Sequence, residues 1–116
     1  MAQENGQLNF YNHLLEMMRL GFLDRKTYKK LMYQSSDGLY EDISISQAQF
    51  KIVPTFFNFN KTIFRGVTFK KCVFENIRFL ESELLRVNFI GCIFNHCDFS
   101  SAKFEECFFD KSYFEI

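Results

Sequence analysis

The chain has 116 residues, 14 Lys and Arg against 14 Asp and Glu, and a hydrophobic content of 47%. This length is typical of a single domain, and the balanced charge excludes an overall field that attracts nucleic acid or an anionic membrane. Seventeen Phe accompany no Trp and one Pro, so the structure requires one flat apolar side chain repeatedly. The start, MAQENGQLNF, has neither a basic segment nor a long apolar run. We therefore expect no signal peptide, no membrane span and a cytoplasmic protein.

Two amphipathic helices are predicted first. Residues 8–22 place an apolar stripe at helical spacing, made of Phe10, Leu14, Met17 and Met18, and Gly21 is a suitable stop. A second helix begins after Asp24, which can cap it, and it turns Tyr28, Leu31 and Met32 inward. We interpret residues 1–37 as a helical hairpin that caps the end of the following structure; a separate binding module is the alternative.

A period of five residues follows the helices. Tyr40, Ile45 and Phe50 are five apart, but the next Phe of the series, Phe59, comes nine residues later, beyond Pro54. We interpret residues 38–50 as a degenerate first coil, out of phase with the rest, and expect a bulge or loop around Pro54.

From residue 57 onward the period is regular. Every fifth position is Phe, with one Leu, and a mostly small or β-branched residue precedes each by two. We call the twelve positions the core ladder: Phe59, Phe64, Phe69, Phe74, Phe79, Leu84, Phe89, Phe94, Phe99, Phe104, Phe109 and Phe114.

The period excludes both regular structures. In an α-helix, residues five apart lie about 140° apart, so the rings would cover every face. In a straight strand an odd spacing alternates faces, which would put half of the rings in water. A short extended step followed by a bend satisfies the spacing, so we expect the chain to coil around its own Phe side chains.

The units CVFEN, CIFNH and CDFSS resemble those of the pentapeptide-repeat family, and the similarity covers residues 57–116. The resemblance implies an all-β solenoid, a right-handed quadrilateral parallel β-helix in which residues twenty apart stack. Together with the helices, we expect an N-terminal helical-hairpin cap at residues 1–37 and a β-helix at 38–116.

We predict that the protein is not an enzyme. His96 adjoins Cys97, but the register turns Cys97 inward and leaves His96 on an outward bend, so the two cannot act as base and nucleophile. His13 falls on the first helix as a surface or cap residue.

The four cysteines predict neither a metal site nor a cofactor. Zinc requires about four converging ligands, whereas twenty-residue stacking puts only Cys72 and Cys92 in one column, with Cys97 and Cys107 in others. We interpret all four as thiols used as small core residues, with a disulfide between Cys72 and Cys92 as an alternative.

The outward positions supply the candidate partner-binding residues. Val73, Ile93 and Tyr113 form an apolar column, and outward corners add Leu80, Leu85 and Ile90. Such a stripe indicates a contact surface, although strand propensity alone also favours these residue types. Charge is sorted as well: residues 55–78 carry five Lys or Arg against one Glu, and residues 79–116 carry seven Asp or Glu against three.

We therefore predict a non-enzymatic protein–protein interaction module that binds an unidentified protein, without direct nucleic-acid or membrane contact. No cover follows Phe114, which indicates either that the sequence is truncated or that another chain covers this end; in the second case we expect a homodimer through the C-terminal end. The family resemblance implies an alternative, a DNA mimic that binds DNA gyrase or topoisomerase IV. Mimicry requires dense negative charge, which this neutral chain lacks.

Overall fold

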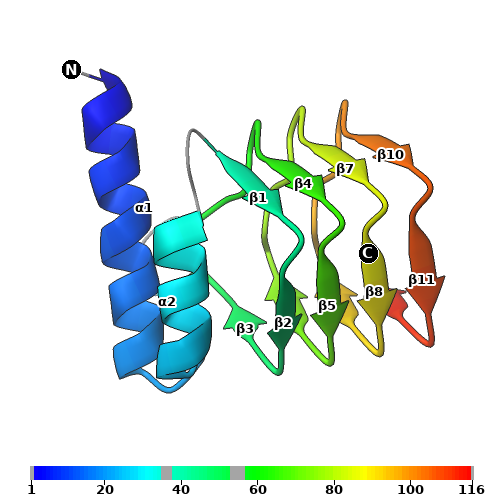
Figure 1. The fold of residues 1–116 in the computed structure, drawn as a ribbon, viewed down its shortest axis with the longest axis horizontal. Coiled ribbons are helices and arrows are strands. Elements are labelled where there is room, and N and C mark those ends of the chain that lie inside the picture. Colours follow the sequence, from blue (N-terminus) through cyan, green and yellow to red (C-terminus); the bar gives the residue numbers. More distant parts are fainter. Residues whose placement is uncertain (1, 35–37, 53–56, 116) are drawn as a thin grey trace.

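The computed structural model describes residues 2–34, 38–52 and 57–115, and it consists of two helices followed by a stack of short parallel strands (Figure 1). Helices α1 (Ala2–Arg19) and α2 (Arg25–Gln34) pack on each other at one end of the stack. Neither helix, over these residues, has the length and apolarity that crossing a membrane requires.

Twelve strands of two or three residues follow the helices. They are β1 (Leu39–Glu41), β2 (Ser44–Ser46), β3 (Gln49–Phe50), β4 (Ile63–Arg65), β5 (Thr68–Lys70), β6 (Val73–Glu75), β7 (Glu83–Leu85), β8 (Asn88–Ile90), β9 (Ile93–Asn95), β10 (Lys103–Glu105), β11 (Phe108–Asp110) and β12 (Tyr113–Glu115).

The strands form three four-stranded parallel sheets, in the orders β1-β4-β7-β10, β2-β5-β8-β11 and β3-β6-β9-β12. Isolated parallel bridges, Asn58 to Arg78 and Arg78 to Asp98, make the fourth side. Partners in successive coils are twenty residues apart, as in Phe74 and Phe94. The predicted quadrilateral parallel β-helix with a helical cap is therefore confirmed.

The first coil is the exception to the twenty-residue step. Tyr40 pairs with Phe64, 24 residues away, because the connection between its third and fourth sides is longer. Phe59 closes this first coil, since its ring stacks on that of Phe79 at 5.5 Å. The bulge expected around Pro54 lies outside the described residues, and the division into domains at residues 37 and 38 stays a prediction.

A left-handed corner explains why the chain repeats every five residues. Each unit combines a three-residue extended segment with a two-residue corner, and the first corner residue has a positive φ. These φ values lie between 51° and 62° at Asp42, Gln47, Lys61, Gly66, Lys71, Asn76, Glu81, Arg86, Gly91, His96, Ser101, Glu106 and Lys111. Such a residue turns the chain sharply, so the small residue and the following ring both reach the interior.

The interior is a column of stacked rings. Phe74 and Phe94 are parallel within 3° at 4.8 Å, and Phe94 and Phe114 within 6° at 4.7 Å. The ladder is buried up to Phe94, and Phe99 is half-buried. In the last coil, however, Phe104, Phe109 and Phe114 are 43%, 39% and 53% exposed, because β10, β11 and β12 are the edge strands of their sheets.

The helices cover the opposite end of the column. Phe10 of α1 stacks on Phe57 at 5.2 Å, the Gln49 amide donates to the Phe22 carbonyl at 2.8 Å, and Lys30 Nζ donates to the Ser44 carbonyl at 2.7 Å. Helix α1 ends at Arg19, and Gly21 shortly after it has a φ of 82°. The helix begins at Ala2, whereas the sequence predicted a start near residue 8. That prediction depended on an apolar stripe, and no such stripe is present before Phe10.

Candidate protein-interaction surface

The last coil exposes a group of large apolar side chains. We call residues 102–115 the C-terminal coil surface. Five of its side chains are 39–72% exposed: Phe104, Phe108, Phe109, Tyr113 and Phe114. Three of them are ladder rings that have a coil stacked on one side and none on the other. The other two, Phe108 and Tyr113, point outward from adjacent sheets. The surface therefore continues from the end of the rod onto its side.

The backbone of the last coil has the same open side. Within the stack each corner amide donates to the next coil, as Lys71 does to Ile90 at 2.7 Å and Gly91 does to Asp110 at 2.8 Å. Lys111 occupies the next such position, and no strand of the described residues lies beyond it. An unpaired strand edge is a template for another chain.

The predicted column of Val73, Ile93 and Tyr113 is in register on one sheet. Exposure increases along it: Val73 is half-buried, Ile93 is 39% exposed and Tyr113 is 72% exposed. The column thus merges with the C-terminal coil surface, and its role in binding stays a prediction.

The predicted corners do not join that column. Leu85 lies on the first sheet between Arg65 and Glu105, and Ile90 lies on the second sheet between Lys70 and Asp110. Both are half-buried, as is Leu80 near the fourth side. Leu85 and Ile90 thus have charged neighbours above and below, and none of the three residues lies in the column of Val73, Ile93 and Tyr113.

Phe108 is a surface residue that the sequence interpretation left out of its candidates. It is 68% exposed and stacks in a column with Thr68 and Asn88. A large aromatic residue in an otherwise polar outward column was the available signal.

Two hollows flank the C-terminal coil surface. One, of about 370 Å³, lies beside the ends of β9 and β12, and its lining includes Asp98, Phe99, Phe114 and Glu115. The other, of about 380 Å³, lies beside Phe108 and is lined by Arg86, Asn88, Glu106 and Phe108. Both combine an aromatic ring with a carboxylate.

Hydrogen bonding favours the ionised form of one of these carboxylates. The Ser100 side chain and the Ser100 amide, which lies 2.9 Å from Asp98 Oδ1, hold the pKa of Asp98 below its usual value. The first hollow therefore presents negative charge beside aromatic rings at neutral pH.

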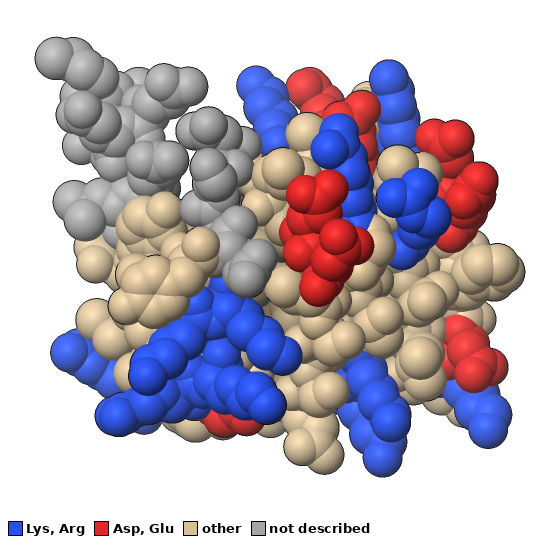
Figure 2. Space-filling model, viewed as in Figure 1, with Lys and Arg blue, Asp and Glu red and all other residues tan. Residues whose placement is uncertain are grey.

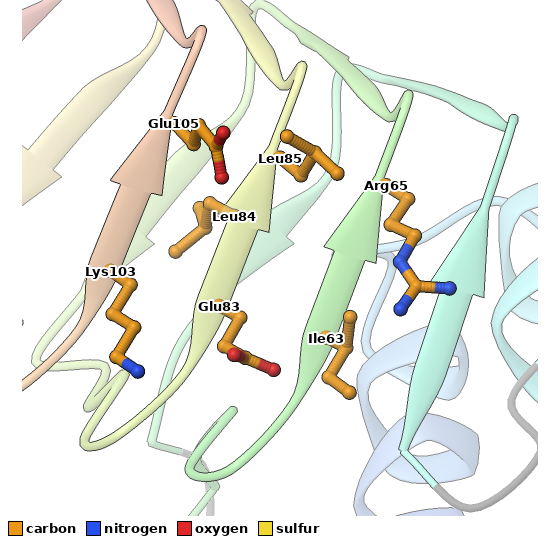
Figure 3. Close-up of a pocket in the computed structure, with 7 residues that line it drawn as sticks. All are labelled: Ile63, Arg65, Glu83, Leu84, Leu85, Lys103 and Glu105. Carbon is orange, nitrogen blue, oxygen red and sulfur yellow. The ribbon is translucent and has the colours of Figure 1, made fainter.

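A third depression lies on the first sheet and is smaller. Figure 3 shows side chains from β4, β7 and β10 around it, with Glu83 between Ile63 and Lys103. Arg65 also lines it and forms an ion pair with Glu41 at 4.0 Å. Its volume of about 130 Å³ is well below the roughly 300–1,000 Å³ of small-molecule sites.

The cysteine thiols serve the interior. Cys72, Cys92, Cys97 and Cys107 are free, and Cys97 Sγ lies 3.2 Å from the Phe74 carbonyl while His96 is exposed at a corner. The hydrogen bond with Cys92 and burial raise the pKa of Cys72, and burial raises that of Cys97. Among the described residues, no three His, Cys, Asp or Glu side chains are arranged to hold a metal ion.

Comparison with known proteins agrees with this architecture. Residues 82–115 match the family model for pentapeptide repeats, in eight copies. Residues 82–115 are therefore pentapeptide repeats. Among solved structures, the chain is similar to the pentapeptide repeat protein Rfr23 from the cyanobacterium Cyanothece 51142. The identity is 10%, the TM-score is 0.37, and the match covers 72% of this chain and 69% of that one. No curated protein matches the chain.

Proposed function

We propose that this protein is a non-enzymatic protein–protein interaction module that docks through its C-terminal coil surface. The observation that carries the proposal is the exposure of five large apolar side chains in one coil. Contiguous apolar surface of this kind marks interaction sites on soluble proteins. Aromatic residues are also the side chains that most often dominate binding energy at interfaces.

The rigidity of the rod supports the same function. Two ladder rings beneath the surface, Phe89 and Phe94, are fully buried and stack on Phe109 and Phe114 at 4.8 and 4.7 Å. A surface fixed in this way loses little conformational entropy when a partner binds. Covering the exposed rings removes apolar area from water at about 25 cal/mol per Å².

The occupant that we propose is another copy of the chain. The edge strands β10, β11 and β12 and the exposed ladder rings are the features that a second copy would cover. Self-association would thus complete a hydrophobic column that is already closed at the helical end.

The surface gives no support to the DNA-mimic alternative. Figure 2 shows Lys and Arg interspersed with Asp and Glu along the visible face of the repeats rather than a continuous acidic stripe. The chain also has no net charge, whereas a duplex presents one negative charge per about 1.7 Å.

The test is to remove the two outward aromatics without touching the ladder. We expect Phe108→Ser with Tyr113→Ser to weaken self-association at least about tenfold, measured by sedimentation velocity, because both rings become desolvated only in the complex. Thermal stability should change little, since both side chains are mostly in water. Thr68→Ser, in the same column as Phe108 but two coils away, is the matched control and should associate normally. A wild-type chain that stays monomeric at millimolar concentration would refute self-association.

A further inference from the structure

Helix α2 carries a second distinctive surface. Arg25, Lys26, Lys29 and Tyr33 are all exposed, and Tyr33 is 82% exposed. At 3.6 residues per turn these four positions fall within an arc of about 100°. We call them the basic helix face; Lys and Arg gather over α2 in Figure 2.

The opposite side of α2 is used for packing, so the basic face is free to bind. Thr27 and Leu31 are buried, and Lys30 reaches the Ser44 carbonyl. The described side chains of residues 10–33 include five Lys or Arg against Glu16 and Asp24. The helical end of the molecule is therefore electropositive.

The C-terminal coil surface has the complementary character. Residues 102–115 carry four carboxylates, at Glu105, Glu106, Asp110 and Glu115, against two lysines. All six charged side chains are exposed. The hollow lined by Asp98, Phe99, Phe114 and Glu115 combines carboxylates with ring faces, which is the environment that stabilises a Lys or Arg side chain.

We propose that copies of the chain associate head to tail, with the C-terminal coil surface of one copy on the basic helix face of the next. The proposal rests on the proposed self-association and names the surface that the coil binds. Lys26 and Lys29 of one copy meet the carboxylates around the hollow of the other, and Tyr33 meets Phe108 and Tyr113.

Charge distinguishes this arrangement from pairing of two C-terminal ends. An end-to-end pair brings two acidic coils together, and like charges across an interface cost free energy. A head-to-tail contact instead joins a surface of net negative charge to one of net positive charge. Complementary potentials both accelerate association and select the partner surface.

The positions of the two surfaces determine what the contact builds. They lie at opposite ends of the long axis, whose extent is 35 Å (Figure 1), so each copy keeps one free surface after the other is occupied. Such heterologous contacts propagate into rings or open chains rather than stopping at a dimer. We therefore expect the average mass of the assemblies to increase with protein concentration and to decrease with salt concentration.

Charge reversal tests the proposal on the 116-residue chain. Lys26→Glu with Lys29→Glu, and separately Asp98→Lys with Glu115→Lys, should each weaken self-association at least about tenfold in sedimentation velocity at low salt. Mixing the two double variants should restore it, because each supplies the surface that the other has lost. Lys70→Glu with Lys71→Glu, two exposed lysines on the side of the rod, is the matched control and should associate as wild type does.

The outcomes separate the two proposals. Association that persists in the Lys26→Glu, Lys29→Glu variant and stops at a dimer overturns the head-to-tail contact but keeps self-association through the coil. A wild-type chain that never associates overturns both. The head-to-tail contact is also overturned if the two charge-reversal variants do not associate when they are mixed, provided that circular dichroism shows each of them to be folded.

Discussion

At the scale of single residues, the interior position of each repeat accepts one shape. Most of the ladder is Phe, and its rings stack across coils at 4.6–5.6 Å, as for Phe79 with Phe99 at 4.6 Å and Tyr40 with Phe64 at 5.6 Å. Leu84 occupies the same position and is 1% exposed. The site therefore selects for apolar volume first and for ring stacking second.

Substitution of ladder rings by alanine should show how the stabilisation from each ring depends on its burial. We expect Phe94→Ala to lower the free energy of unfolding by about 3–5 kcal/mol, because it opens a cavity between two rings. Phe114→Ala, in the same column but 53% exposed, should cost less than half as much. Urea denaturation of both variants makes the comparison, and equal losses would contradict the exposed state of the last ring.

The sequence predicted which residues form the ladder but not which of them are covered. Periodicity reports the direction of a side chain, and it assigned Phe104, Phe109 and Phe114 to the interior as it did Phe74 and Phe94. Whether another layer lies above a ring depends on tertiary stacking, which a five-residue period does not encode. Phe108 is a different case, because the period itself assigns it to an outward position, and a large aromatic residue in a polar column was readable from the sequence.

At the scale of elements, short local signals determine where the helices begin and end. Asp24 was predicted as an N-cap, and the Thr27 amide donates to its Oδ1 at 2.7 Å. Gly21 was predicted as a stop, and the amides of Gly21 and Phe22 donate back to Met18 and Met17 at 3.0 and 2.9 Å. These signals were readable because a cap requires a specific side chain or φ value.

The N-cap should contribute in a pH-dependent way. The hydrogen bonds from Thr27 hold the pKa of Asp24 below 3.8, so the folded state favours the carboxylate. This stability is fully present above the unfolded pKa near 3.8 and is lost as pH falls through the lower, folded pKa.

We expect Asp24→Ala to destabilise the protein by about 1 kcal/mol at pH 7, measured by urea denaturation. Asp24→Ser, which keeps an acceptor, should retain most of the stability and lose the part of the acid-side pH dependence that Asp24 contributes. An alanine variant as stable as wild type at pH 7 would show that packing against α1 and β1 holds the helix without the cap.

At the scale of the whole molecule, the two ends of the rod differ. The helical end covers Phe57 and Phe59, which are buried, whereas the other end leaves its rings and strand edges exposed. In a stack whose coils contact only their neighbours, stability is a sum of local terms. The uncovered coil therefore has the fewest stabilising contacts.

Amide hydrogen exchange should reveal this gradient. At concentrations where the chain is monomeric, we expect the amides of β10, β11 and β12 to exchange at least about tenfold faster than those of β4 to β9. Raising the concentration should slow exchange in the last coil of wild type, but not in the variant that lacks the Phe108 and Tyr113 rings. Uniform protection along the stack would contradict the open end.

Because a corner follows every three-residue segment, the number of residues in the chain determines the direction in which later side chains point about the rod axis. Because four units complete one circuit, inserting five residues between two corners would rotate every later side chain by a quarter turn about the rod. Inserting twenty would move the same side chains one layer along the axis without rotating them. The number of residues between Lys29 and Tyr113 thus determines the angle between the two binding surfaces about the rod axis. Duplicating a single pentapeptide would change that angle, and with it the helical pitch of an assembly.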